Sequence, residues 1–320
     1  MQPIQPLVSV ITVNYNQIEA TCALLDSLRA QNWKHYEVWV VDNGSLVNPE
    51  THLNVHYPEA RVIRSEVNLG FAGGNNLALK QAQGDYLFLL NNDTEVTPES
   101  IGQLVRFLQQ HPRCGAVSPL LCYYPSAADL RYDIIQYAGM TPVSSVTARN
   151  STIGAGEEDR GQYSAPAPTA YTHGAAMLLP AAVVEQAGLM PEEYFLYYEE
   201  LDWCEQIKAA GYDLWVAPTA KIYHKESLST GASGALKTYF LCRNRLLFVQ
   251  RNKRWKSVFY TYFLLVALPK AVLSAFLKGE KEQLKAIVQA ARFFFFGKQN
   301  SFEQFARTTS RAQPEALAIE

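Results

Sequence analysis

The sequence contains little cysteine, and its cysteines show no paired spacing. The five positions are Cys22, Cys114, Cys122, Cys204 and Cys242, and no Cys-x-x-Cys pair occurs among them. This distribution argues against a disulfide framework or a zinc site and indicates reduced, structural thiols, as in a cytosolic protein. The first residues also lack a basic start followed by an apolar core, so we expect no signal peptide.

Three nucleotide-binding signatures are absent as well. No P-loop sequence occurs, which argues against a kinase or an ATPase. The glycines do not spell Gly-x-Gly-x-x-Gly after the first expected strand, which disfavours a dinucleotide oxidoreductase. A sugar-phosphate nucleotidyltransferase would need a glycine-rich loop with arginine and lysine directly after that strand, and 14–16 reads Asn-Tyr-Asn instead.

The sequence does contain enough apolar material for a sizeable core, with 48% hydrophobic and 12% aromatic residues. Apolar runs predict strands at 7–14, 36–41, 61–64 and 85–94, and the stretches between them predict helices. Strands that alternate with helices predict a parallel, doubly wound α/β sheet. Residues 119–170 show no regular period, and we interpret them as an insertion of loops and small strands that covers the site. Strand character returns at 170–179, 214–216 and 221–224.

Polar residues follow three of these strands, at 14–16, 42–45 and 91–93. Parallel strands end at one edge of a sheet, where open α/β sheets bind their ligands. With the glycine-rich stretch at 68–76, whose glycines would let backbone approach a ligand, these ends predict a nucleotide cleft. Asp42 would accept hydrogen bonds from a pyrimidine or a ribose, and Asn91 and Asp93 offer oxygens to a hard cation. Taken singly, each motif is more typical of an ordinary polar turn, and only together do they indicate a cleft.

Three acids, Glu199, Glu200 and Asp202, crowd the start of a helix expected to run to Ala210. A helix N-terminus favours ionised carboxylates, which suits a general base at neutral pH. Helix capping alone would explain one acid, but not three. We therefore predict Glu200 as the base, with Asp202 as its orienter or its rival. Gly174 would allow close approach of a donor sugar, or it forms a strand bulge.

The ordered set VSVITVNYN, VVDNGS, NLGFAGGNN, LLNNDT, HGAAMLL, YYEELDW and a later histidine resembles the inverting, GT-A-fold glycosyltransferases of family 2. It is most similar to their bacterial rhamnosyltransferase branch, through the GEEDRGQY-like loop at 156–163. The resemblance covers about residues 7–250. It implies a GT-A fold, Rossmann-like with a mostly parallel sheet and flanking helices, followed here by amphipathic C-terminal helices.

The resemblance also implies site residues. Asp42 matches the residue that holds the nucleobase, Asp93 the last carboxylate of the DxD metal motif, His224 the late histidine ligand and Glu200 the base. Mn²⁺ or Mg²⁺ is the implied cofactor, and because Asn91 replaces the first DxD carboxylate, the dependence on metal is open. The residues expected to line the donor site are Thr12, Asn14, Asp42, Asn68, Gly70, Asn76, Asn91, Asn92 and Gly174.

Charge is distributed unevenly along the chain. Residues 1–236 carry 13 basic and 25 acidic side chains, whereas residues 237–298 carry 13 and 2. The basic region also holds an apolar run at 258–277, interrupted by Pro269-Lys270, and a second amphipathic stretch that ends in four phenylalanines. We predict a catalytic domain at 1–236 and a helical region at 237–320 that associates with an anionic membrane face. A true membrane span and a soluble cap or oligomer interface are the alternatives, and the apolar runs disfavour nucleic acid.

The sequence thus predicts an inverting glycosyltransferase of cell-surface polysaccharide synthesis. It would move a sugar from a nucleotide diphosphate sugar, first dTDP-L-rhamnose and next a UDP-sugar, to a hydroxyl of a lipid-linked saccharide. We expect it in the cytoplasm, peripheral on the inner face of the cytoplasmic membrane. The alternative is a non-catalytic nucleotide-sugar-binding or glycan-binding protein of the same fold.

Overall fold

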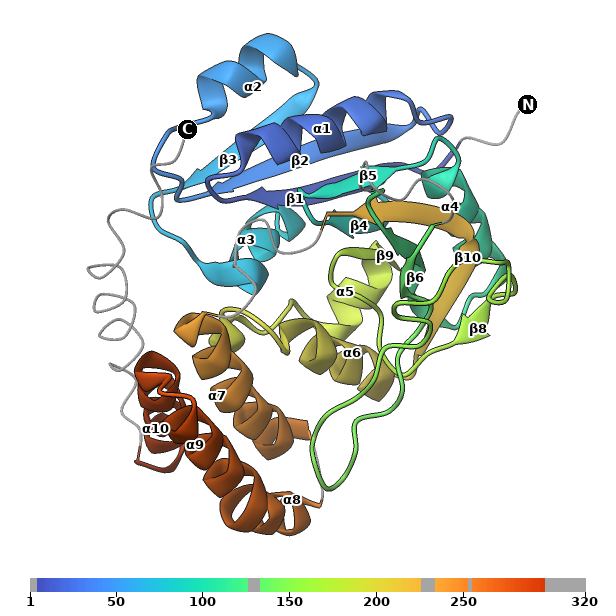
Figure 1. The fold of residues 1–320 in the computed structure, drawn as a ribbon. Coiled ribbons are helices and arrows are strands. Elements are labelled where there is room, and N and C mark those ends of the chain that lie inside the picture. The colour runs from blue at the N-terminus through green and yellow to red at the C-terminus, as the bar shows by residue number, and fades with distance from the viewer. Residues whose placement is uncertain (1–4, 126–132, 226–233, 253–254, 297–320) are drawn as a thin grey trace. The chain divides into compact units, whose positions relative to one another are not determined.

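The computed structural model describes residues 5–125, 133–225, 234–252 and 255–296. Its contacts divide the chain into two compact units. Met1–Ser144 and Arg149–Ser229 form the first, and Ser145–Ala148 and Thr230–Glu320 form the second. The first unit carries a large sheet, and the second carries the C-terminal helices (Figure 1).

Ten strands in the described part of the chain form one mixed, mostly parallel sheet. They are β1 (Val8–Asn14), β2 (Tyr36–Asn43), β3 (Ala60–Ser65), β4 (Tyr86–Leu90), β5 (Thr94–Val96), β6 (Cys114–Tyr123), β7 (Ile135–Tyr137), β8 (Ala167–Pro168), β9 (Ala176–Pro180) and β10 (Asp213–His224). Their order is β3-β2-β1-β4-β9-β6-β10-β5, with β7 beside β6 and β8 beside β10. β1 is parallel to β2 and β4, whereas β9 runs antiparallel to β4 and β6.

Helices cover both faces of the first half of this sheet. They are α1 (Ile18–Arg29), α2 (Glu50–His56), α3 (Gly70–Leu79), α4 (Ser100–Gln110), α5 (Ala181–Ala187), the short 3₁₀ turn η1 (Glu192–Tyr194) and α6 (Glu199–Ala209). In Figure 1, α1 and α2 lie on one side of β1–β3 and α3 on the other. Strand side chains alternate between the two faces, so Val8 and Val10 join the core that includes Leu24 and Leu28 of α1. Continuous apolar strands such as β1 are the consequence of this two-sided burial.

Three expected elements differ from the structure. The glycine-rich stretch is mostly helix, because α3 begins at Gly70 and includes Gly73 and Gly74. There the missing Cβ atoms let the helix pack closely: a Cβ on Gly74 would lie 2.9 Å from a methyl group of Val13. The strand expected at 170–179 begins only at Ala176, after a turn. The two closing strands are one strand, β10, with an irregularity between Ala217 and Lys221.

The second unit consists of α7 (Ala235–Asn252), α8 (Lys256–Tyr262), a π-helical turn η2 (Phe263–Ala267), α9 (Leu268–Leu277) and α10 (Lys281–Phe296). The run from Lys256 to Leu277 is one continuous helical segment of 22 residues. Its π-helical turn precedes Pro269, which has no backbone N–H to donate to the turn before it. The part of the predicted C-terminal region at 297–320 lies outside the described residues.

Gly70 provides a test of how α3 is anchored. Its φ is +75°, and a Cβ there would collide with the carbonyl group of Phe195, whose oxygen also accepts the Phe71 N–H at 2.8 Å. We expect Gly70→Ala to lower the free energy of unfolding by about 2–5 kcal/mol, from the left-handed backbone and the collision together.

Gly156→Ala is the matched control, because Gly156 has a φ of +83° but no atoms within 4 Å of a built Cβ. It should lose only the backbone contribution, about 1–2 kcal/mol. Urea unfolding of both variants measures the difference, and equal losses would show that the Phe195 contact contributes nothing.

Candidate active site

The polar ends of β1 and β2 meet at one edge of the sheet, as their parallel register requires. Asn14 lies opposite Asp42, and the Asn14 amide donates to Asp42 Oδ1 at 3.1 Å. The same amide reaches Ser45 Oγ at 3.2 Å, and Ser45 Oγ accepts the backbone N–H of Asn16 at 2.8 Å. Asp42 is completely buried in the absence of a ligand. A buried carboxylate held by donors on two sides forms the floor of this end of the site.

Arg64 supplies the second donor to Asp42, and the sequence analysis gave it no role. Its guanidinium donates to Asp42 Oδ2 at 2.9 Å, and its side chain keeps 27% of its surface exposed. Arg64 is the second-to-last residue of β3, directly opposite Asp42 in the parallel β2–β3 register. The pairing register of β2 and β3 is the feature from which Arg64 could have been predicted as a partner of Asp42. Because Asp42 has no exposed surface, a nucleobase here would meet the partly exposed guanidinium of Arg64, which the carboxylate holds in place.

Several residues expected to bind the donor instead hold the protein together. Asn68 Oδ1 accepts the Gly70 N–H at 2.9 Å and the Asn43 amide at 3.0 Å, which fixes the start of α3. The Asn76 amide is buried and donates to Met190 O and Glu192 Oε1, both at 2.8 Å. The Asn68 oxygen thus stabilises the turn before α3, and the Asn76 side chain stabilises the loop before α6.

Thr12 and Asn92 also point into the framework. Thr12 is fully buried within β1, and its hydroxyl has no hydrogen-bond partner among the described residues. The Asn92 amide donates to Thr21 Oγ1 at 3.1 Å and to Gln17 O at 3.3 Å, which ties the turn after β4 to α1. Asn92 therefore positions Asn91 and Asp93 on either side of it.

Asp93 and His224 come together from the ends of two different elements. Asp93 Oδ1 lies 3.1 Å from His224 Nε2, and both side chains are at least nine-tenths buried. His224 ends β10, and its Nδ1 lies 2.8 Å from Gln136 Oε1 on β7. A carboxamide oxygen can only accept, so Nδ1 carries a proton in this contact, and Nε2 is the ring nitrogen that faces Asp93.

This pair fits a divalent cation. Asp93 Oδ1 is buried and has no hydrogen-bond partner among the described residues, and His224 Nε2 lies 3.1 Å from it. A carboxylate oxygen and an imidazole lone pair are the mixed ligands that suit Mn²⁺ or Mg²⁺. The Asn91 amide nitrogen lies 3.4 Å from the same Nε2, so Asn91 is adjacent as well, although only its carboxamide oxygen could be a ligand. Gln136, which sets the tautomer, is a residue that the sequence analysis missed.

Glu199 and Glu200 begin α6 as a pair of acids, of which Glu199 is buried and Glu200 is partly buried. Burial, followed by the charge of Glu200, raises the pKa of Glu199 well above its usual range. Burial also raises the pKa of Glu200, although backbone N–H groups of the helix start oppose the rise. The expectation that the helix N-terminus alone sets ionisation was therefore incomplete, because desolvation outweighs it. The Oε2 atoms of both residues are buried and have no hydrogen-bond partner among the described residues.

Asp202 has different surroundings from Glu200. It is buried, its Oδ2 accepts the Tyr194 hydroxyl at 2.6 Å, and its Oδ1 accepts the Gln206 amide at 3.3 Å. Residues two positions apart on a helix face different sides. These contacts favour a structural role in joining α6 to η1 over the role of rival base.

Gly174 lies next to Glu200. A Cβ on Gly174 would sit 3.6 Å from Glu200 Cβ and Cγ, so the turn before β9 passes directly over the acid. On the other side, three aromatic residues precede α6 with positive φ: Phe195 at 65°, Tyr197 at 68° and Tyr198 at 76°. Side chains other than glycine rarely adopt such angles, and clusters of them concentrate at functional sites.

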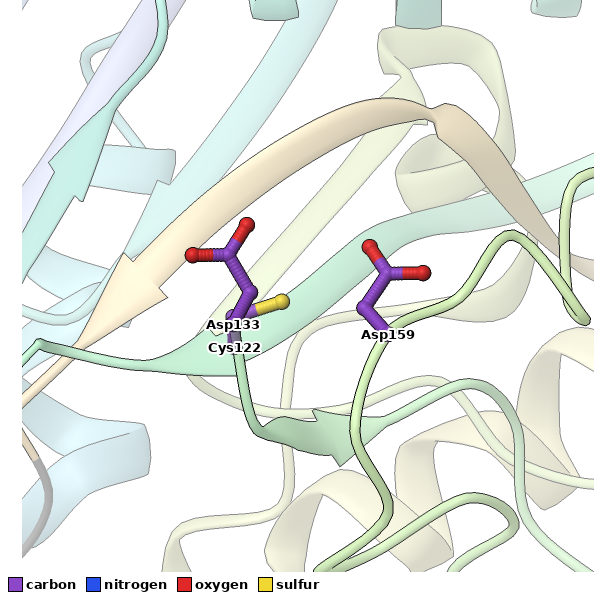
Figure 2. Close-up of side chains that lie close together, drawn as sticks. All are labelled: Cys122, Asp133 and Asp159. Atoms are coloured by element: carbon purple, nitrogen blue, oxygen red, sulfur yellow. The ribbon is translucent and has the colours of Figure 1, made fainter. Parts of the chain in front are cut away.

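A second group of acids lies beside β10 but does not form a metal site. Cys122 Sγ and the carboxylates of Asp133 and Asp159 lie within 4.8 Å of one another (Figure 2). The Lys221 ammonium lies 2.8 Å from Asp133 and 2.6 Å from Asp159, in the place that a cation would take. Burial opposes this charge, but the two hydrogen bonds raise the pKa of Lys221 overall. Burial raises the pKa of the Cys122 thiol to about 12, so the sulfur is not a thiolate ligand.

Comparisons with known proteins agree with this arrangement. A family model described as "Glycosyl transferase family 2" matches residues 9–153. An uncharacterized protein, y4gI of Sinorhizobium fredii, is 28% identical over 269 residues, which cover 79% of this chain and 28% of that protein. An N-acetylglucosaminyl-diphospho-decaprenol L-rhamnosyltransferase of Mycobacterium tuberculosis is 26% identical over 242 residues, covering 71% of this chain and 78% of the relative. The Haloferax volcanii hexosyltransferase Agl10 is 25% identical, with coverage of 75% and 74%.

Solved structures share the fold at low identity. GalNAc-T7 with UDP, GalNAc and Mn²⁺ has a TM-score of 0.60 at 15% identity, covering 83% of this chain and 57% of that one. A mannosyltransferase of Pyrobaculum calidifontis with GDP-Man and Mn²⁺ has a TM-score of 0.55 at 16% identity, with coverage of 98% and 83%. The sheet with its flanking helices is therefore a GT-A fold.

The buried acid pair predicts how stability depends on pH. The pKa of Glu199 is raised on folding, so its contribution to stability is complete below the unfolded pKa and is lost as pH rises through the folded value. Glu199→Gln mimics the protonated form. Near pH 4.5 the melting temperature of the variant should be only slightly above that of the unmodified protein. The difference should grow as the pH rises to 8.

Thermal unfolding across this pH range measures the effect. Glu50→Gln, in the first turn of α2 and exposed, is the control and should show no such trend. A constant difference between Glu199→Gln and the unmodified protein at all pH values would contradict the raised pKa.

Proposed function

This chain belongs to glycosyl transferase family 2, and from that premise we propose that it transfers a hexose, with inversion, from a nucleotide diphosphate sugar to a hydroxyl of a lipid-linked saccharide. The observation that carries the proposal is the pairing of Asp93 Oδ1 with His224 Nε2 at 3.1 Å, on the edge where Asp42 and Asn14 also lie. One edge thus offers a nucleobase contact and a cation site for a diphosphate. The Glu200 side chain, whose carboxylate would serve the acceptor, lies beside the turn before β9. Strand β9 starts at this edge.

The donor we favour is dTDP-L-rhamnose, with a UDP-sugar as the alternative. The support is the mycobacterial relative, whose name specifies an L-rhamnosyltransferase acting on a diphospho-decaprenol carrier. Thymine and uracil present the same ring nitrogen and carbonyl groups, so Asp42 and Arg64 would suit either base. The same name supports a lipid-linked acceptor, and the name of Agl10 supports glycan assembly in general.

In the proposed reaction, Glu200 holds the proton that the acceptor hydroxyl loses as it attacks the anomeric carbon. The carboxylate must be ionised for this step, and burial places its pKa above the usual range. Activity should therefore fall on the acid side at a higher pH than an ordinary glutamate would give. A Cβ built on Gly174 would lie 3.6 Å from Glu200 Cβ and Cγ, so the turn before β9 packs beside the proposed base.

Asp93 and His224 would hold the divalent cation, with Asn91 beside them. When bound, the cation neutralises negative charge on the leaving diphosphate. Gln136 keeps the imidazole proton on Nδ1, so that Nε2 faces the metal position. Because Asn91 replaces a carboxylate, the site carries less negative charge than a DxD motif would give it.

A panel of nucleotide sugars tests the proposal directly. dTDP-L-rhamnose, UDP-GlcNAc, UDP-Glc and GDP-Man should be compared by thermal shift and by hydrolysis, each with Mn²⁺ and with EDTA. A donor that binds only the folded state raises the melting temperature by mass action. Binding without hydrolysis or transfer to any acceptor would favour the non-catalytic alternative. If only a UDP-sugar stabilises the protein, that UDP-sugar and not dTDP-L-rhamnose is the donor.

Removing the base should separate chemistry from binding. We expect Glu200→Gln to reduce transfer by about 100- to 10,000-fold, the usual share of a general base, with donor affinity nearly unchanged. Steady-state kinetics and donor titration measure the two effects. Asp202→Asn is the comparison, and it should mainly lower stability. If Glu200→Gln keeps near-normal turnover while Asp202→Asn loses it in a folded protein, the base is Asp202.

The cation site makes a second prediction. Asp93→Ala should weaken nucleotide-sugar binding far more in Mn²⁺ than in EDTA, because the lost oxygen serves the ion. Gln136→Leu, which removes the acceptor for His224 Nδ1–H, should weaken Mn²⁺ binding by about 10- to 100-fold. Electron paramagnetic resonance of free Mn²⁺ in the presence of dTDP measures this without turnover.

Gln136→Glu controls for packing, because it keeps an acceptor at the same place and should retain most of the affinity. Equal loss in Gln136→Glu and Gln136→Leu would assign Gln136 a packing role only. Equal weakening of Asp93→Ala in Mn²⁺ and EDTA would mean that Asp93 is not a ligand.

A further inference from the structure

The helical segment from Lys256 to Leu277 has two apolar sides, and the second unit covers one of them. Phe259, Phe263 and Ala275 are buried. The Arg245 guanidinium of α7 lies over the rings of Phe259 and Phe263, 6.0 and 5.3 Å from their centroids. This side of the segment faces its neighbouring helices.

Large apolar side chains occupy the uncovered side. Leu265, Phe276 and Leu277 are 73%, 68% and 74% exposed, far more than a packed helix surface would leave them. Leu265 and Phe276 are eleven residues apart, which is about three helical turns, so they share one side. The other exposed members are Leu264, Val266 and Leu273. Large apolar side chains that gather exposed on one helical segment mark an interaction site.

We infer that this surface inserts into the interface of an anionic lipid bilayer, with the segment lying in the membrane plane instead of crossing it. The segment is long and apolar enough to cross a bilayer by length and composition. Its packing argues otherwise, because α10 lies against it: Tyr260 contacts the rings of Phe294 and Phe295, with centroids 5.7 and 6.5 Å apart.

A crossing would carry α10 into the hydrocarbon as well. The exposed residues of α10 include Lys281, Glu282, Lys285 and Arg292, and charges at that depth are strongly unfavourable. Lys270, exposed near the middle of the segment, would also have to enter. In an in-plane arrangement one side of the segment meets lipid, and these charges remain at the aqueous boundary.

Charge complementarity identifies the lipid as anionic. Residues 237–298 carry 13 basic and 2 acidic side chains, whereas residues 1–236 are net acidic. Basic side chains beside an inserted apolar face add attraction to anionic headgroups, and salt screens that attraction. The inference is independent of which sugar the enzyme transfers, and it would survive a failure of the donor assignment.

Flotation of the full-length protein with vesicles tests the inference. The protein should float with phosphatidylcholine vesicles that contain phosphatidylglycerol, less with phosphatidylcholine alone, and less as salt increases. Leu265→Ser should lower the partition coefficient by about tenfold, and Leu265→Ser with Phe276→Ser further, because each removes buried apolar area. Val55→Ser is the matched control, since Val55 is 68% exposed on α2, and it should bind normally.

Two further measurements separate the alternatives. Bound protein should be released at alkaline pH, whereas retention would show a spanning helix and overturn the in-plane arrangement. Analytical ultracentrifugation shows whether the same variants dissociate an oligomer. Normal flotation of the Leu265→Ser, Phe276→Ser variant would overturn the inference. Loss of a dimer with no vesicle binding by the unmodified protein would assign the surface to another copy of the chain.

Discussion

The direction of the strands is the constraint on which the candidate site depends. β1, β2 and β4 are parallel, so Asn14, Asp42 and the turn holding Asp93 emerge at one edge. β9 runs the other way, which brings its beginning, and with it Gly174, to the same edge. β6 is antiparallel to β9 and β10 is parallel to β6, so β10 also ends there, with His224. A slip of one strand by one residue would turn its polar end to the other face.

Several features near this edge lower the stability of the fold unless a bound ligand offsets their cost. Asp93, Glu199 and Glu200 each have a buried carboxylate oxygen without a hydrogen-bond partner in the described part of the chain. Three aromatic residues before α6 adopt left-handed backbone angles. Unsatisfied acids and strained backbone together are uncommon in a region that serves only packing. Their concentration around Glu200 and Asp93 argues for binding and catalysis more strongly than any one motif does.

The sequence predicted the parts of this site that depend on strand ends. Asn14, Asp42 and Asp93 each follow an apolar run, and a parallel sheet brings such residues together without further information. Burial could not be deduced in this way, so the raised pKa values of Glu199 and Glu200 were missed. Glycines were misleading, because Gly70 and Gly74 serve close packing of α3 against Phe195 and Val13.

No sequence pattern predicted the role of Gln136. Its position shows that the irregular insertion helps to orient His224. It sits on β7, a strand of only three residues, which cannot fix a side chain by itself. The strand is held by the Ile135 N–H to Glu157 O at 2.8 Å, and by the Lys221 ammonium, which binds Asp133 and Asp159. Lys221 lies on β10, the strand that ends in His224. The insertion and the histidine are thus anchored to the same strand. The tautomer of His224, and with it the fit of the site to a cation, therefore depends on a stretch of sequence that carries no recognisable metal motif.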